Sequence, residues 1–164
     1  MSDIQLHHIF NHLAPIGVMT GFIVLMAGLI LKKPHVRLTA AWIILIAGLT
    51  ALPANKTGEM AEETSENIAG VSHDAIHEHE EAAELALQLT LVSAVLALAF
   101  IIGEKKFPQW KNAIMWIMMA ATLSAVITLT IASHQGGLIR HPELSGQANP
   151  SAPGSTQEEE EHDD

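Results

Sequence analysis

Cysteine and tyrosine are both absent from this chain of 164 residues, and charged residues are scarce. Without cysteine the chain cannot form disulfides, thiolate metal sites, iron–sulfur clusters or covalent c-type haem links. Without tyrosine it has no phenol for proton or radical chemistry. Charged residues make up 16 %, against about 25 % in soluble domains. Hydrophobic residues reach 49 % and the mean hydropathy is positive, which is typical of a membrane protein.

Basic residues are few as well. Eight Lys and Arg stand against 18 Asp and Glu, which gives a formal net charge of −10. A surface that binds the phosphate backbone needs an excess of positive charge, so the net charge argues against nucleic acid as a partner. The sequence shows no nucleophile–base pair, phosphate-binding loop or protease motif. An enzyme is therefore not the favoured interpretation.

What the chain has instead is long apolar runs, which predict membrane-spanning helices. A span needs about 20 apolar residues, with roughly 17 to 25 tolerated. No run shows the polar face that a soluble helical bundle would need. The expected spans are residues 13–31, 38–54, 85–103 and 113–133. The predicted fold is an all-α integral membrane four-helix bundle over residues 1–144, with an outer helical loop at 55–84 and a disordered acidic tail at 145–164.

Local signals also predict where the helices start. We expect Pro15 in the first turn of the first span, where its missing N–H has no helical partner to lose. Thr57, followed by acidic residues, is expected to start a separate helix inside the outer loop. Ser72 is expected to cap the helix that enters the third span.

The positions of the basic residues predict the orientation of the bundle. Six of the eight follow the first and third spans, at Lys32, Lys33, Arg37, Lys105, Lys106 and Lys111. We therefore expect both of these loops on the cytoplasmic side of a bacterial inner membrane, and both termini on the outer, periplasmic side. The first span has no basic segment before it and no cleavage site after it, so we interpret it as retained.

Histidine is unusually frequent, and nine of the ten histidines fall on the predicted outer side. A b-type haem needs axial histidines from two helices, and small residues that admit the macrocycle. The candidate ligands are His12, His79 and His141, with Arg140 placed to pair with a haem propionate or a lipid headgroup. We expect His79 to point inward, on the small-residue side of the third span. The small residues expected to leave space for haem b are Gly17, Gly21, Gly28, Ala82, Ala83, Ala86, Gly136 and Gly137.

A non-haem metal such as iron or zinc is the second interpretation. Glu59 and Glu63 are four residues apart on one helical face, and His79 is next to Glu80. Together with His12 they form the candidate metal-binding set, and the density of carboxylates favours a hard or borderline divalent cation. Whether His73, His77 and His134 are ligands or are simply solvated stays open at this point.

Several motifs resemble those of an uncharacterised family of small bacterial four-helix membrane proteins. They are Asn11–Gly17 (NHLAPIG), Thr57–Glu63 (TGEMAEE), His79–Ala83 (HEEAA) and Gly136–Glu143 (GGLIRHPE). The chain also resembles, more distantly, the DUF2231 membrane domain, which opens on a histidine before its first span and closes on a glycine pair and a basic–histidine step. The resemblance covers about residues 8–144 and departs at Met60, where a proline is expected.

This resemblance implies a ranking of the candidate residues and a modest preference for redox chemistry. The DUF2231 domain is sometimes fused to cytochrome c modules, which favours electron transfer. The residues that the resemblance ranks first are His12, Glu59, His79, Glu80, Arg140 and His141.

Three functions remain open at the level of sequence. The first is a membrane redox protein that binds b-type haem or a redox metal at the periplasmic edge of the bundle and exchanges electrons with an external partner, such as a periplasmic cytochrome drawn by the acidic face. The second is a non-haem metal-binding membrane protein. The third is a non-catalytic subunit of a larger membrane complex. A transporter is disfavoured because no charged residue lies in the middle of a span.

Overall fold

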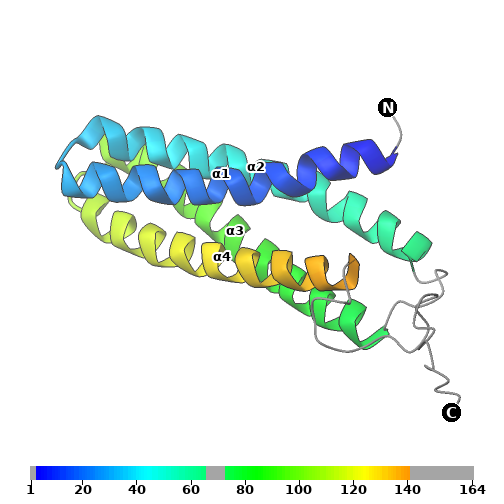
Figure 1. Cartoon of the computed structure of the whole chain (residues 1–164). Helices are drawn as coiled ribbons and strands as arrows, with labels where there is room; N and C mark the ends of the chain where they lie inside the picture. The colour runs from blue at the N-terminus through cyan, green and yellow to red at the C-terminus, as the bar shows by residue number, and fades with distance from the viewer. Residues whose placement is uncertain (1–2, 66–72, 141–164) are drawn as a thin grey trace, which may run out of the picture.

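A computed structural model describes residues 3–65 and 73–140, and describes side chains for residues 12–56 and 76–138. These residues form four α-helices: α1 (Asp3–Ile30), α2 (Pro34–Ser65), α3 (His73–Lys106) and α4 (Lys111–Arg140) (Figure 1). The helices contain the four apolar runs, apart from Leu31 at the end of the first, and each helix is long and apolar enough to cross a membrane. The predicted all-α four-helix fold is confirmed for this part of the chain.

The four helices form two antiparallel hairpins. α1 packs along α2, α3 packs along α4, and α2 packs against α3, whereas α1 and α4 are packed more loosely. The short connections, residues 31–33 and 107–110, lie at the same end of the molecule, here named the turn end. The opposite end, where α1 and α3 start and α2 and α4 finish, is named the terminal end.

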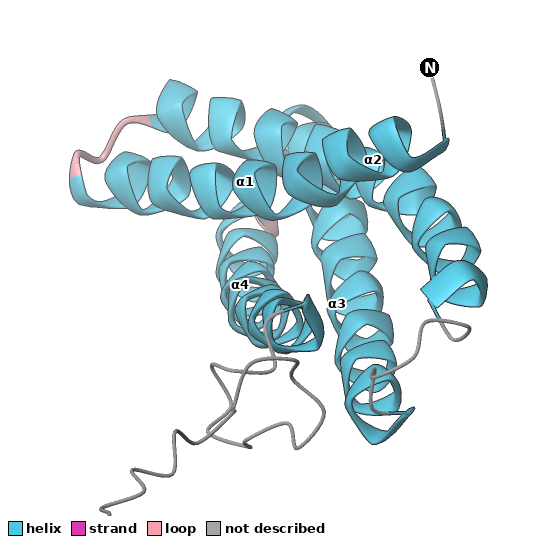
Figure 2. Ribbon diagram, turned by 45° about the vertical axis from the view of Figure 1, so that its right-hand side comes forward, coloured by secondary structure: helices cyan, strands magenta, loops and turns pink. Residues whose placement is uncertain are grey.

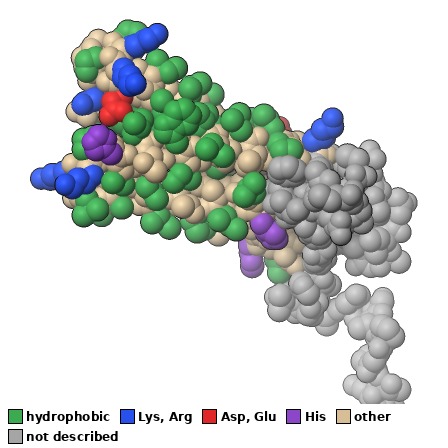
Figure 3. All heavy atoms as spheres, turned by 90° about the horizontal axis from the view of Figure 1, so that it is seen from above, with side chains coloured by type: hydrophobic (Ala, Val, Ile, Leu, Met, Phe, Trp, Pro, Cys, Tyr) green, Lys and Arg blue, Asp and Glu red, His purple; other side chains and the backbone are tan. Residues whose placement is uncertain are grey.

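The bundle buries an apolar core and leaves many large apolar side chains outside. Leu25, Ile44 and Met118 are fully buried between the helices. By contrast, Ile23 is 60 % exposed and Val95 is 67 % exposed. Hydrophobic side chains cover the middle of the face shown in Figure 3. A soluble monomer rarely exposes so large an apolar band, and lipid chains are the environment that suits it.

Glycines allow α1 to approach α2 closely. A Cβ atom on Gly21 would lie 2.5 Å from Cγ1 of Ile44, and one on Gly28 would lie 2.9 Å from the backbone nitrogen of Arg37. Gly17 meets Ala47 in the same way. Small residues at such crossings are how membrane helices pack. The expectation that these three glycines leave space for haem is therefore wrong, because α2 fills that space.

The turn between α1 and α2 is closed by backbone hydrogen bonds. Lys32 has a positive φ of 54°, its N–H donates to the carbonyl of Leu29 at 3.2 Å, and the N–H of Lys33 donates to the carbonyl of Gly28 at 3.0 Å. This pair of bonds is a Schellman motif, in which the left-handed position is usually glycine. The Nε–H of Arg37 donates to the same Gly28 carbonyl at 3.0 Å, which fixes α2 to the end of α1.

The helices extend well beyond the expected spans. α2 has 32 residues and α3 has 34, so they are about 48 and 51 Å long at about 1.5 Å per residue. α2 continues through Pro53 and Thr57, so the helix start expected at Thr57 is wrong. Within the predicted outer loop, residues 55–65 belong to α2 and residues 73–84 to α3. Ser72 and the predicted tail lie outside the described residues.

Pro15 lies inside α1, which begins at Asp3, and the expectation that it occupies the first turn is wrong. Proline removes one helical hydrogen bond and crowds the carbonyl four residues earlier, but a membrane helix tolerates it where neighbouring helices support the backbone. Figure 1 shows the first part of α1, in dark blue, turned away from the axis of the rest.

Candidate functional site

His79 faces the inside of the bundle near the start of α3. The buried face of α3 includes Ile76, Ala86 and Thr90. His79 follows Ile76 by three residues and precedes Ala86 by seven, so it lies on this face, and its side chain is partly buried. The inward orientation expected for His79 is confirmed by its contacts with α4.

The imidazole of His79 is hydrogen-bonded to the backbone of α4. Its Nδ1 lies 2.9 Å from the carbonyl oxygen of Ala132. A carbonyl only accepts, so Nδ1 must carry the proton, and in the neutral ring Nε2 then keeps its lone pair. The contact thus fixes the tautomer as well as the orientation of the ring, and leaves Nε2 as the nitrogen that can bind a metal.

Gly136 makes room for this ring. A Cβ atom at Gly136 would lie 3.0 Å from Cε1 and 3.3 Å from Nδ1 of His79. At the neighbouring Gly137 an added Cβ would meet nothing within 4 Å. The two glycines of the motif therefore differ: the first accommodates the imidazole, and the second borders open space.

Gln135 is a polar residue of this region that sequence reasoning missed. It follows Ala132 by three residues and precedes Gly136, and its Oε1 is buried without a hydrogen-bond partner among the described residues. Leaving a buried amide oxygen unpaired is unfavourable, so this atom can accept a hydrogen bond or bind a cation. The available signal was periodicity, because Gln135 continues the buried face that contains Ala125 and Ala132.

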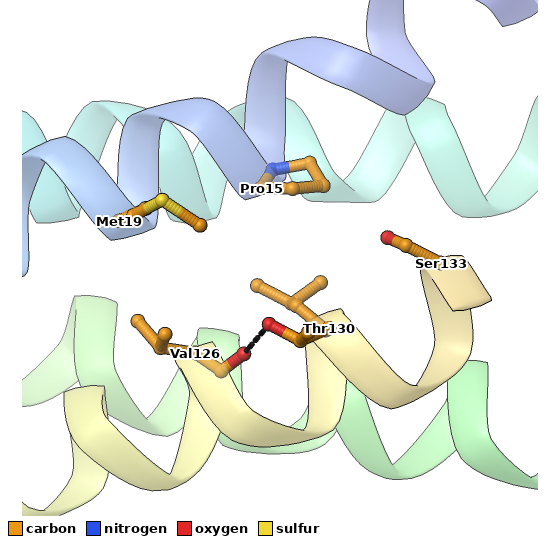
Figure 4. Close-up of a pocket in the computed structure, with 6 residues that line it drawn as sticks. Pro15, Met19, Val126, Thr130 and Ser133 are labelled. Carbon is orange, nitrogen blue, oxygen red and sulfur yellow. Dashed lines mark hydrogen bonds between the residues drawn. The ribbon is translucent and has the colours of Figure 1, made fainter.

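His12 lies at the same level of the bundle, on the side where α1 meets α4. A cavity of about 170 Å³ between these helices is lined by Pro15, Met19, Val126, Leu129, Thr130 and Ser133 (Figure 4). His12 is three residues beyond Pro15 towards the terminal end, and Gly136 is three residues beyond Ser133. His12 and His79 therefore share one layer, but the side chain of His12 is exposed.

His77 and Glu80 pair with each other on the outer surface of α3. Nδ1 of His77 lies 3.7 Å from Oε2 of Glu80, and its Nε2 lies 3.5 Å from Oε1 of Glu81. The side chain of His77 is 72 % exposed. Glu80 is thus next to His79 in sequence but is turned to His77, and His77 is solvated. His134 is also exposed.

The remaining candidates are only partly described. Glu59, Glu63, His73 and Arg140 belong to helices whose side chains are not described there, and His141 lies outside the described residues. The final turns of α2, which carry Glu59 and Glu63, diverge from the start of α3 in both ribbon views (Figures 1 and 2). Among the side chains at 12–56 and 76–138, no three His, Asp or Glu come together as a metal site.

Comparison with known protein families, curated protein sequences and solved structures finds no match for this chain. The resemblance drawn from the motifs therefore stays a prediction.

Proposed function

We propose that this protein is a membrane redox protein of the bacterial inner membrane that binds a metal centre through His79. The observation that supports it is the hydrogen bond from Nδ1 of His79 to the carbonyl of Ala132. Histidines that bind metals donate their other ring N–H to a carbonyl or a carboxylate, which fixes the tautomer and the ring orientation. The imidazole of His79 has this arrangement.

The position of His79 along the bundle suits electron exchange with a partner outside the membrane. His79 precedes Lys106 by 27 residues, or about 40 Å along α3, and a bilayer with its headgroups is about 40–45 Å thick. If the basic turn end marks the cytoplasmic surface, His79 reaches the headgroup level of the periplasmic leaflet. The exposed side chains of Glu78, Glu81 and Glu84 on the same stretch of α3 would attract a basic partner.

The described packing favours a metal ion over haem b as the bound centre. Residues of α2 occupy the space beside the glycines of α1, and the His79 ring occupies the space beside Gly136. The cavity between α1 and α4, at about 170 Å³, is smaller than the roughly 300–1,000 Å³ of most small-molecule sites. A redox metal would supply one-electron exchange. The chain would supply the oriented imidazole of His79, with His12, Gln135 and His141 as candidates to complete the ligand set.

A reduced-minus-oxidised absorption spectrum, with elemental analysis of the same sample, tests this proposal. The protein is purified in mild detergent without chelators. Bound iron or another redox metal without a haem α-band is the expected result. A sharp α-band with an equivalent amount of iron would identify the bound centre as haem b and not as a metal ion, and the proposed redox function would stand. A flat spectrum without bound metal would contradict the proposal and leave the non-catalytic subunit as the better interpretation.

A further inference from the structure

Five lysines gather at the turn end, far from His79. They are Lys32, Lys33, Lys105, Lys106 and Lys111, here named the basic turn patch, and all five are exposed. They lie in or beside the two hairpin turns, which are at the same end of the molecule (Figure 1). On the face shown in Figure 3, Lys and Arg side chains concentrate at one end, beside a band of hydrophobic side chains.

Little within the described chain balances this charge. Glu104 is the only acidic residue among the described residues near the turns, and it is partly buried. Neither α2 nor α4 has an acidic residue in its first turn. Arg37 is separate from the patch, because its Nε–H donates to Gly28 and its Nη1 lies 3.7 Å from the sulfur of Met115. The patch therefore presents uncompensated ammonium groups to its surroundings.

Exposed aromatic side chains lie beside the basic turn patch. Trp110 is 61 % exposed and Phe107 is 51 % exposed, and both lie in the turn between α3 and α4. Exposed tryptophan at the end of a membrane helix sits at the headgroup level. Lys106 and Lys111 flank this turn and are exposed, so they lie at the same level of the bundle as these aromatic side chains.

We propose that the basic turn patch binds the headgroups of anionic phospholipids. Long lysine side chains at a helix end extend to the interface, where they attract negatively charged lipid. The charge, the exposure and the depth of the patch all fit this ligand. The inference does not depend on whether His79 binds a metal.

Quenching of tryptophan fluorescence by brominated lipid measures this preference. The full chain is reconstituted in phosphatidylcholine vesicles that contain either brominated phosphatidylglycerol or brominated phosphatidylcholine. All three tryptophans, Trp42, Trp110 and Trp116, lie in the turn-end half and report on lipid there. We expect phosphatidylglycerol to bind about threefold to tenfold better than phosphatidylcholine at low salt, and the preference to shrink as salt rises.

A triple variant and a matched control test the assignment. Lys33→Gln, Lys105→Gln and Lys106→Gln together should bring the preference close to one, whereas Lys56→Gln, an exposed lysine at the terminal end, should leave it unchanged. Equal quenching by the two lipids in the wild type, or a triple variant that keeps the preference, would overturn the proposal. If the triple variant fails to fold, Lys106→Gln alone and a salt titration of the wild type test the proposal. Both should reduce the preference for phosphatidylglycerol, and a preference that neither reduces would overturn the proposal.

Inorganic phosphate separates a lipid headgroup from a soluble anion. It is added to the wild type at constant ionic strength. The preference for phosphatidylglycerol should survive, because the patch faces many headgroups at once. If phosphate abolishes the preference, the ligand is a soluble anion and the lipid proposal is overturned.

Discussion

At the scale of single residues, the contact of Gly136 with His79 distinguishes the two glycines of the Gly136–Gly137 pair. The imidazole lies against the backbone of α4 at Gly136, where an added Cβ would be 3.0 Å from Cε1. The ring is also held by its hydrogen bond to Ala132, so it cannot move away without loss. Gly137 has no such neighbour.

Replacing each glycine by alanine separates these roles. Gly136→Ala should lower the free energy of unfolding by up to about 2 kcal/mol, because shifting the ring from a close-packed position costs about 1–3 kcal/mol and the better helix propensity of alanine offsets about 1 kcal/mol of that. Gly137→Ala should be neutral or stabilise by up to about 1 kcal/mol, because alanine is the better helix former. Denaturation in detergent, followed by circular dichroism, measures both. Equal effects of the two substitutions would show that His79 does not depend on this contact.

The sequence predicted part of the site. The inward face of His79 followed from its spacing to Ala82 and Ala83, and the structure confirms that orientation. The partner of His79 was not predictable, because a backbone carbonyl has no signature in the sequence and its position depends on the register between α3 and α4. The same register decides that the amide oxygen of Gln135 is buried.

At the scale of elements, the turn between α1 and α2 contains a residue in an unfavourable conformation. Lys32 has a φ of 54°, where a side chain clashes with the following carbonyl. Lys32→Gly should therefore stabilise the protein by about 1 kcal/mol, since glycine adopts this conformation freely. Thermal unfolding in a neutral detergent measures the change. Lys33→Gly removes a charge at the neighbouring position and should not stabilise the protein. An equal gain in stability from both substitutions would mean that the loss of charge, and not the backbone conformation of Lys32, causes the effect.

The existence of the helices was predictable, and their lengths were not. The apolar runs indicate only the parts of the helices that suit a bilayer, and apart from Leu31 each run lies inside its helix. Pro15 and Thr57 are residues typical of helix starts, but both lie inside helices. In a bundle, packing against neighbouring helices outweighs one missing hydrogen bond or one favourable capping residue. The local sequence signals therefore predict helix starts at positions that lie inside longer helices.

At the scale of the whole molecule, charge is divided between the two ends. Six of the eight basic residues lie at or beside the turn end, and the acidic stretch of α3 lies towards the terminal end. This division underlies the proposed orientation, with both termini in the periplasm. The two proposed sites therefore lie at opposite ends of the bundle, with lipid phosphate at the turn end and a metal centre at the terminal end.

The proposed orientation can be tested with single cysteines, because the chain has none of its own. Lys56→Cys lies at the terminal end and Gln109→Cys at the turn end, and both positions are exposed. A membrane-impermeant maleimide applied to intact spheroplasts should label Lys56→Cys and leave Gln109→Cys unlabelled until the cells are lysed. The reverse pattern would invert the bundle and place His79 on the cytoplasmic side.

The metal content of the purified wild type and of His79→Asn tests the central claim most directly. The amide N–H of asparagine can replace Nδ1–H as the donor to Ala132, but asparagine has no counterpart of Nε2. We expect His79→Asn to keep its helical content and thermal stability and to lose bound metal about tenfold or more. His77→Asn, at the exposed histidine two residues earlier, should keep the metal of the wild type. A folded His79→Asn variant that retains that metal would contradict the account and leave His79 as a structural tether between α3 and α4.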